Sequence, residues 1–515
     1  MRAVHVTVPD VIICTLCLAL QLLLLGGLLA GDDWRMERVR SELLYEAVAD
    51  DISSMIAAGT LVPGQRIPSV RRLSQQRRIS ITTVLLAYQL LENRGVIEAK
   101  PQSGYYVRQD PARHQEEPAE TRPPRAAQPV DVHALVSRVL EDRRWNELVP
   151  FGASMPHPDA VPTARLRRIL SAVMRRNPKA LANYSFPPGH ESLRRQIALR
   201  MRDWGVRATA DDVIITNGCI EAINLCLRAV TKPGDIVALE SPTYFGLLQI
   251  IESLGMKALE LPTHPRDGVS LDALRTAIDR EKVKACVLMP TVSNPLGSTM
   301  PDKAKKRLVK LLADRDIPLI EDCVYHALHF GTSTPFAAKA YDRKGGVMLC
   351  SSFSKTFAPG FRIGWAVPGR YAAAVQTLKF VNTIGVPDVL QLATAEFLEN
   401  GGYDRLLRKI RRTYARQLEL IKATVSRSFP ARTRMTHPSG AFVLWVVMPE
   451  AVDAIKLYEH AITENIGLAP GPMFTASSRY RNCVRINCGV PWSREAERAL
   501  ERIGELARAQ LTNGQ

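Results

Sequence analysis

The chain has 515 residues, of which 46% are hydrophobic and 23% charged, a composition typical of folded globular proteins that excludes a disordered chain. Because 68 Lys and Arg residues face 51 Asp and Glu residues, the formal charge is +17 and an anionic partner is expected. Nine cysteines without a close-set framework exclude a disulfide scaffold and indicate reduced thiols in a cytosolic protein.

The chain begins with an apolar stretch. Residues 11–30 contain one Gln and no charge, and a helix of that length spans a bilayer. Residues 1–35 are therefore predicted to be a membrane anchor or uncleaved signal, or else an in-frame extension upstream of Met36. Cys14 and Cys17 in this stretch form the only CxxC motif, and since a second ligand pair is missing, no metal site is predicted.

A small, basic helical unit follows. Apolar residues recur at helical spacing from Leu43 to Ala57, and Ser69 and Ser80 are suited to begin two further helices. Two short strands around a turn are expected between Gly95 and Val107. The pattern is that of a helix-turn-helix with a wing, mainly α with a β hairpin. From Arg66 to Arg108 the unit has eight basic and two acidic residues, and this excess of positive charge suits the unit to contacts with phosphate groups.

This unit resembles the winged helix of GntR-type regulators along its whole length, from PGQRIPSVRRLSQQRRIS at Pro63 to SGYYV at Val107. The resemblance implies binding to double-stranded DNA. The family usually has an arginine after the serine that opens the recognition helix, whereas this chain has Ile81. The residues expected to contact DNA are Arg66, Ser69, Arg71, Arg72, Ser80, Thr82, Thr83 and Gly104.

The winged helix is predicted to occupy residues 41–109, and a linker rich in Pro, Glu and Arg residues 110–148, because few apolar side chains are available there. From residue 149 to 508, apolar strand-like runs alternate with helical patterns. This alternation predicts an α/β domain with a mostly parallel sheet and crossover helices. The runs are 213–216, 236–240, 285–289, 319–322 and 347–350.

Lys355 ends an apolar, β-prone run in the stretch CSSFSKTFAPGFRIGW. A lysine amine attacks an aldehyde only when part of it is deprotonated, which enclosure and neighbouring cations promote. The Ser352 and Ser354 hydroxyls and the Arg362 guanidinium are suited to a phosphate. An aldehyde and a phosphate in one ligand indicate pyridoxal 5'-phosphate.

Other residues in the chain suit the remaining parts of this cofactor. Asp322 ends a strand and would keep the pyridine nitrogen protonated. Tyr325 and Asn294 are able to hydrogen-bond the phenolic oxygen, and Tyr244 is able to stack on the ring. Taken singly, each of these residues has an ordinary structural explanation, but the whole set does not.

Two further groups complete the predicted site. Gly218, followed by Cys219, lies at a strand-to-helix turn, where backbone N–H groups meet a phosphate. Arg485, in a late strand-like run, is suited to hold a substrate carboxylate.

The region from about Phe151 to Leu506 resembles the fold-type I, class I aminotransferases, on the motifs NPLG, EDCVY and SSFSKTFAPGFRIGW and the late arginine. The resemblance implies that Lys355 is the Schiff-base lysine and that the other residues have the roles given above. It also implies that Tyr184 reaches the phosphate of the partner subunit, in a homodimer with shared sites.

This chain departs from the family pattern directly after Gly218. Relatives often carry a Ser or Thr and a Gln there, whereas this chain has Cys219, Ile220 and Glu221. A side-chain donor is lost and a negative charge is added, so weaker phosphate binding is expected.

A GntR winged helix joined to an aminotransferase-like domain is the arrangement of MocR-type regulators. It implies a cytoplasmic transcriptional regulator that senses a small amine or amino acid through a pyridoxal phosphate aldimine on Lys355. Two alternatives remain open. One is an active class I aminotransferase with an appended DNA-binding domain, and the other is a regulator tethered to the membrane through residues 11–30.

Overall fold

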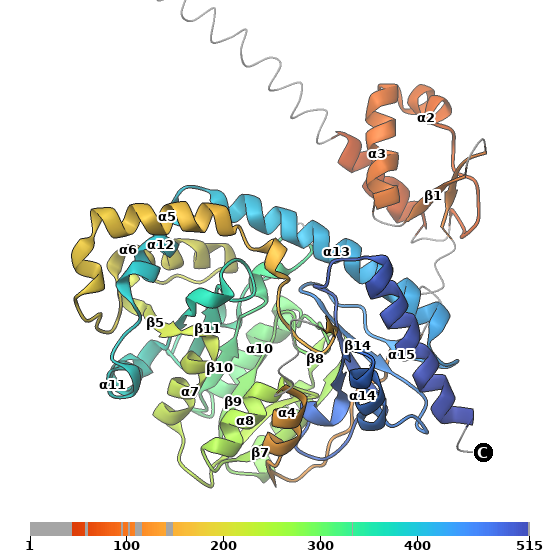
Figure 1. Ribbon diagram of the computed structural model, residues 1–515. Coiled ribbons are helices and arrows are strands. Elements are labelled where there is room, and N and C mark those ends of the chain that lie inside the picture. The colour runs from red at the N-terminus through yellow and green to blue at the C-terminus, as the bar shows by residue number, and fades with distance from the viewer. Residues whose placement is uncertain are drawn as a thin grey trace, which may run out of the picture. The chain divides into compact units, whose positions relative to one another are not determined.

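The chain divides into two compact units, Met1–Asp110 and Pro111–Gln515 (Figure 1). The apolar stretch 11–30, with Cys14 and Cys17, and Met36 lie outside the residues that are described. Within those that are, no helix is long and apolar enough to cross a membrane. The computed structural model describes residues 44–56, 60–93, 96–100, 103–108, 116–140, 148–331 and 333–512.

The smaller unit has the predicted helix-turn-helix and wing. A helix over residues 44–56 precedes α2 (Val70–Arg77) and α3 (Ile81–Asn93). The wing consists of β1 (Ile97–Lys100) and β2 (Gly104–Val107), which pair antiparallel.

Tyr88 of α3 lies at the centre of this unit. Its side chain is fully buried, its hydroxyl donates to the carbonyl of Pro68 at 2.5 Å, and its ring meets that of Tyr105 edge-on at 4.9 Å. Since Tyr105 belongs to β2, this contact fixes the recognition helix against the wing.

A nine-stranded sheet forms the centre of the larger unit (Figure 1), in the order β3-β7-β6-β9-β10-β11-β12-β5 with β8 paired to β7. Strands β7, β6, β9, β10 and β11 are parallel, and β12 runs antiparallel between β11 and β5. The five predicted runs are β5, β6, β9, β10 and β11, with ends within two residues of those predicted. The strands are β3 (Gln128–Pro129), β5 (Ile214–Asn217), β6 (Ile236–Ser241), β7 (Lys257–His264), β8 (Gly268–Val269), β9 (Val283–Leu288), β10 (Leu319–Asp322), β11 (Val347–Ser352) and β12 (Ile363–Val367).

Helices cover both faces of this sheet because its strands are apolar on both sides. In β6, Val237 and Leu239 belong to one buried cluster and Ala238 to the other. Ile223 of α7 packs in the first cluster and Leu308 of α10 in the second. The helices between the strands are α7 (Gly218–Val230), α8 (Phe245–Ser253), α9 (Leu271–Arg280) and α10 (Asp302–Ala313).

A second, antiparallel sheet of order β13-β14-β17-β16 lies in the C-terminal part of the unit. Its strand β17 (Cys483–Asn487) carries Arg485 and is buried along its whole length. The other elements here are β13 (Arg434–Met435), β14 (Val443–Val447), β16 (Ala469–Pro470), α13 (Gly402–Ser428), α14 (Ala454–Thr463) and α15 (Arg494–Thr512).

The structure differs from the predicted linker, 110–148. Its described residues 116–140 pack on the larger unit, where β3 pairs with β7 and α4 (His133–Leu140) buries Val136. Thr121 donates its hydroxyl to the carbonyl of Ser241 at 2.6 Å. The Pro-rich composition concealed this packing, because an extended segment is held by edge pairing and side-chain hydrogen bonds and needs few apolar residues.

The packing of α4 is tested by Val136→Ala. This change should lower the free energy of unfolding of the larger unit by about 1 to 3 kcal/mol, because two buried carbon atoms are lost and a cavity is left. The measurement is urea or thermal unfolding against wild type. Arg138→Ala on the exposed side of the same helix is the control and should cost less than about 0.5 kcal/mol. Equally small effects of both changes would show that α4 does not pack as described.

Candidate functional site

The predicted cofactor residues lie where the strands of the large sheet end. Because β5, β6, β9, β10 and β11 point the same way, their carboxyl ends share one edge of the sheet. A cavity of about 160 Å³ at this edge, here called the lysine pocket, brings nine of the predicted residues together. Its lining consists of Cys219, Ile220, Tyr244, Met289, Asn294, Asp322, Val324, Tyr325, Ser352, Ser354, Lys355 and Arg362.

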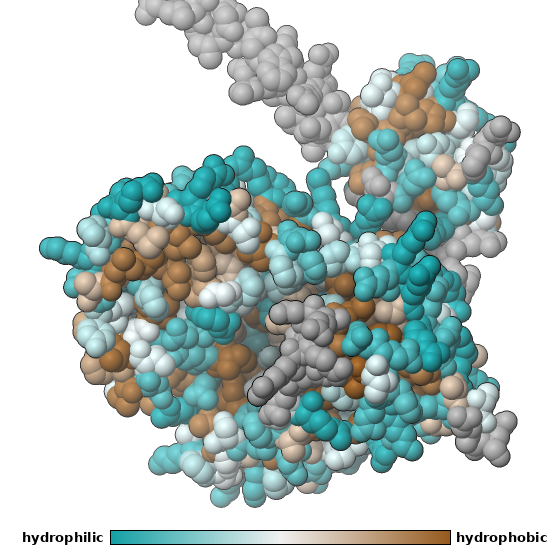
Figure 2. All heavy atoms as spheres, viewed as in Figure 1, coloured by the Kyte–Doolittle hydropathy of each residue, from teal (hydrophilic) through white to brown (hydrophobic). Residues whose placement is uncertain are grey.

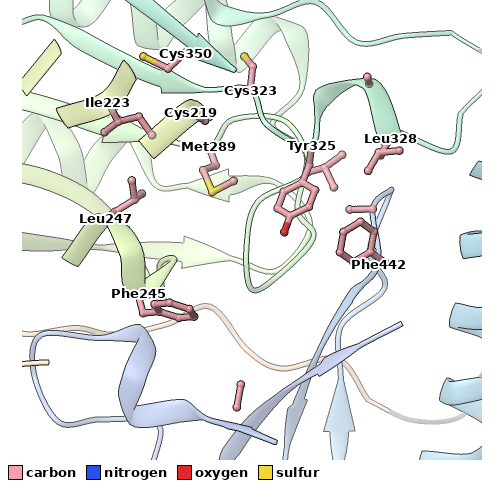
Figure 3. Close-up of a cluster of buried hydrophobic side chains, with 14 of the residues drawn as sticks. Cys219, Ile223, Phe245, Leu247, Met289, Cys323, Tyr325, Leu328, Cys350 and Phe442 are labelled. Carbon is pink, nitrogen blue, oxygen red and sulfur yellow. The ribbon is translucent and has the colours of Figure 1, made fainter. Parts of the chain in front are cut away.

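Tyr325 forms one wall of the lysine pocket. Its ring packs edge-on against Phe442 at 5.6 Å, and its hydroxyl shares a short hydrogen bond with the hydroxyl of Ser154. Figure 3 shows Cys219 and Met289 on the opposite side of Tyr325 from Phe442. Burial raises the pKa of Tyr325, so its hydroxyl is protonated at neutral pH.

Lys355 lies in the turn after β11, and its amine donates to the backbone carbonyl of Ser154. Burial and the nearby Arg485 guanidinium lower the pKa of Lys355 to about 8, although the Asp322 carboxylate acts in the opposite direction. Roughly a tenth of the amine is therefore unprotonated at pH 7. That fraction makes Lys355 a nucleophile.

Asp322 ends β10 at the base of the pocket. Its Oδ1 accepts the N–H of Val324 at 2.9 Å and the thiol of Cys219 at 3.3 Å. Burial raises the pKa of Asp322 to about 6, while both hydrogen bonds favour the ionised form. The described residues give Oδ2 no hydrogen-bond partner, so this oxygen is available to a ligand.

The negative charge at Glu221 is balanced. Although burial acts against it, hydrogen bonds from Lys379 and Asn217 hold the pKa of Glu221 below its usual value. The fully buried Lys379 amine lies 2.8 Å from the Glu221 carboxylate, and the Asn217 N–H lies 2.6 Å from it. The negative charge that the sequence places beside the phosphate cradle is therefore neutralised by an ion pair within the chain.

Arg362 and the start of α7 form a cradle for an anion. Arg362 donates to the Ser354 hydroxyl at 3.0 Å and to the carbonyl of Asn217 at 3.3 Å. A Cβ atom at Gly218 would lie 2.3 Å from the guanidinium, so glycine permits this close approach. No described carboxylate pairs with Arg362, and the positive end of the α7 dipole lies beside it. A phosphate fits this arrangement.

Arg485 is a second cation without a carboxylate. It is fully buried, and it donates to the carbonyl of Gly152 at 2.5 Å and to Oδ1 of Asn294 at 3.4 Å. Its Nε has no hydrogen-bond partner, and none of the described acids forms an ion pair with it. Because an unpaired buried charge is costly, an anionic ligand fits here. Asn294 joins this group to the lysine pocket.

Tyr184 does not line the lysine pocket. Its side chain is 76% exposed, and its ring lies 6.4 Å from that of Phe186, which stacks on Phe380 at 6.2 Å. Val381 is also exposed, so an apolar patch surrounds Tyr184 on the surface of the unit.

A larger cavity of about 780 Å³ lies beside α5 (Thr163–Arg176), where Figure 2 shows apolar surface. Ala153 and Met155 line it, whereas Ser154 between them contacts Lys355 and Tyr325. The two cavities share no lining residue, so we do not assign the larger one to the cofactor.

The predicted DNA contacts fall into two groups in the smaller unit. Ser69 and Ser80 cap α2 and α3, since their hydroxyls accept the N–H groups of Arg72 at 3.3 Å and of Thr83 at 3.0 Å. Thr83 is buried and its hydroxyl lies 2.7 Å from that of Ser80, so it does not face outward as predicted. The predicted contacts that are exposed are Arg66, Ser69, Arg71, Arg72, Ser80, Thr82 and Gly104.

Two family models match the chain, the gntR family of bacterial regulatory proteins over residues 44–107 and aminotransferase class I and II over residues 151–503. The uncharacterized HTH-type transcriptional regulator YjiR of Escherichia coli strain K12 is 40% identical over 90% of this chain and 98% of its own length. The chain belongs to the MocR-type GntR regulators. Another regulator similar to this MocR-type chain, NorG of Staphylococcus aureus strain N315, is 26% identical over 85% of this chain and 98% of its own length.

Solved aminotransferases share the fold of the larger unit of this MocR-type regulator. LysN, the α-aminoadipate aminotransferase of Thermus thermophilus, complexed with N-(5'-phosphopyridoxyl)-L-leucine, matches with a TM-score of 0.68 and 26% identity. The match covers 73% of this chain and 95% of LysN. An archaeal alanine:glyoxylate aminotransferase matches with a TM-score of 0.70 and 25% identity over 74% and 96% of the two chains. The predicted fold and the role as a DNA-binding transcriptional regulator are confirmed.

The lowered pKa of Lys355 predicts selective labelling. In cofactor-free protein, the rate at which an acylating reagent modifies Lys355, followed by mass spectrometry, should reach half its maximum near pH 8. Arg485→Met should move this midpoint to higher pH, because a positive charge that disfavours the ammonium form is removed. Arg498→Met, an exposed change on α15, should leave it unaltered. A midpoint insensitive to Arg485→Met would refute the electrostatic explanation.

Proposed function

We propose that this regulator binds pyridoxal 5'-phosphate on Lys355 and adjusts transcription in response to a small amine or amino acid. The observation that carries the proposal is the meeting of a partly deprotonated lysine, a buried carboxyl group and two unpaired guanidinium groups at one edge of the sheet. The complex of LysN with a phosphopyridoxyl amino acid supports it.

The residues present fit the parts of this cofactor. The cradle at Arg362, with its unpaired cation and the close glycine, suits the phosphate. The available Oδ2 of Asp322 suits the pyridine N–H. The proposed contacts are Ser352, Ser354, Arg362, Gly218 and Cys219 for the phosphate, Asp322 for the ring nitrogen, Asn294 and Tyr325 for the phenolic oxygen, and Tyr244 for the ring face.

Bound pyridoxal phosphate would supply an aldehyde for which the Lys355 amine and an incoming primary amine compete. Arg485 would hold the carboxylate of an amino acid effector through its partnerless Nε, in exchange for the bond that it now makes to Gly152. The lowered pKa of Lys355 would let the lysine leave the aldehyde and return to it near neutral pH.

The segment around Gly152 and Ser154 offers a route from this site toward the DNA-binding unit. Arg485 and Lys355 hold its backbone carbonyls, so an effector that engages both side chains would release both contacts at once. The segment follows β4 (Val149–Pro150), and the chain reaches β4 from the DNA-binding unit through residues 116–140, which pack on the larger unit. A change in how this segment is held would bias the DNA-binding units.

We also propose a homodimer. The exposed patch formed by Tyr184, Phe186, Phe380 and Val381 is apolar enough to favour a covering partner. A second copy would cover it and place Tyr184 near the partner's phosphate cradle. Two winged helices would then read two half-sites.

A working aminotransferase is the second candidate. The lysine pocket has both the lysine and the buried carboxyl group that transamination would use, and the 2-aminoadipate transaminase of Thermus thermophilus is 29% identical over 71% of this chain. Rapid turnover of an amino acid with 2-oxoglutarate would favour the enzyme over a sensor.

Cofactor binding is tested without any assay of activity. Protein loaded with pyridoxal phosphate should absorb visible light, and borohydride reduction should add the mass of the reduced cofactor to the peptide that contains Lys355. Lys355→Ala should lose both signals, whereas Lys310→Ala, at an exposed lysine, should keep them. A visible band that survives Lys355→Ala, or a label on another lysine, would overturn the assignment.

A further inference from the structure

Over residues 81–90, the exposed face of the recognition helix α3 carries no charge. Ile81 is 50% exposed, Leu85 42% and Leu86 41%, although this helix has only 13 residues. In Figure 2 the smaller unit bears a hydrophobic patch over α2 and α3. Exposed aliphatic side chains gathered in this way mark a binding surface. Ile81, Leu85 and Leu86 are here called the apolar stripe, and the polar Thr82 and Gln89 are exposed beside it.

Cations lie close to the apolar stripe in the chain. Arg71 and Arg72 are exposed on α2, and no described carboxylate pairs with either. Arg66 is also exposed and lies against Gly104 of the wing, 3.3 Å from the position of a Cβ atom there. Arg77 differs, because it forms an ion pair with Asp51. This arrangement matches a partner that has anionic groups along its edges and apolar groups between them.

The major groove of DNA has that character, with phosphates at its rims and thymine methyl groups on its floor. The gntR family model matches this unit, so DNA is the partner that we assign to the apolar stripe. In a helix-turn-helix the first residues of the second helix reach the base edges. Ile81 is the first residue of α3 and Leu85 lies one turn further on the same face.

We propose that Ile81 and Leu85 read the C5 methyl groups of thymines, so that each operator half-site carries T·A pairs opposite the start of α3. An arginine at residue 81 would donate two hydrogen bonds to guanine, whereas isoleucine has no donor and packs against a methyl group. Thr83 is buried and Ser80 caps the helix, so the exposed hydrogen-bonding side chains on this face are Thr82 and Gln89, and neither is a cation like the arginine that Ile81 replaces. Ile81 is thus a specificity-determining residue.

The proposal is tested by selecting binding sites from random DNA with the full-length, cofactor-loaded protein. Wild type should enrich T·A pairs at fixed positions of each half-site, and Ile81→Arg should enrich G·C pairs at one of these positions. Val62→Arg is the matched control, since Val62 is 51% exposed in the same unit but outside α3. It should keep the wild-type preference. An unchanged selection by Ile81→Arg would overturn the proposal.

A second measurement isolates the methyl group. Deoxyuridine in place of thymidine opposite Ile81 should weaken binding of the selected operator by about fourfold, because one buried methyl contact is lost. With Ile81→Ala, the same replacement should have no effect. Circular dichroism and retained binding to nonspecific DNA would show that this exposed change leaves the fold intact. Equal losses in wild type and Ile81→Ala would contradict direct methyl recognition.

Discussion

Arg485 is buried in β17 and has no carboxylate partner among the described residues, and this uncompensated charge governs the chemistry of the larger unit. Burial and the Arg485 guanidinium together lower the pKa of Lys355, and the guanidinium also donates a hydrogen bond to the carbonyl of Gly152. Burial of an ion costs free energy that hydrogen bonds to carbonyl and amide oxygens offset only in part. An arriving carboxylate would complete the compensation. The same residue therefore contributes to the lowered pKa of Lys355 and, in the proposed function, would hold the carboxylate of the effector.

The parallel sheet is what makes this concentration of charge possible. Parallel strands place their carboxyl ends at one edge, so Asp322 at the end of β10 and Lys355 after β11 meet although crossover segments separate them. The antiparallel strand β12 then returns the chain so that Arg362 faces the start of α7. Backbone pairing in the core therefore positions the strand ends from which these side chains project.

Much of the fold and of the site follows from local sequence. Lys355, Asp322 and Arg362 lie in short motifs with recognisable chemistry, and the apolar runs gave five central strands because buried parallel strands are continuously apolar. Contacts between distant segments carry no local signal. Three such contacts appear only in the structure. They are the ion pair of Glu221 with Lys379, the hydrogen bond from Lys355 to Ser154, and the packing of residues 116–140 on the rest of the larger unit. The burial of Thr83 could not be predicted either. Serine and threonine side chains hydrogen-bond at the start of a helix, as Thr83 does with Ser80, but the same side-chain types also contact DNA bases.

The proposed sensing is tested most directly by the affinity of the cofactor-loaded protein for its operator. This affinity is measured by fluorescence anisotropy in the presence of a panel of amines and amino acids. Wild type and Lys355→Ala share the same DNA-binding unit, so they differ only in the capacity of the larger unit to respond. If an effector acts through Lys355, at least one compound will change the affinity of wild type and leave Lys355→Ala unaltered at every concentration. An equal change in both proteins would contradict sensing through this lysine.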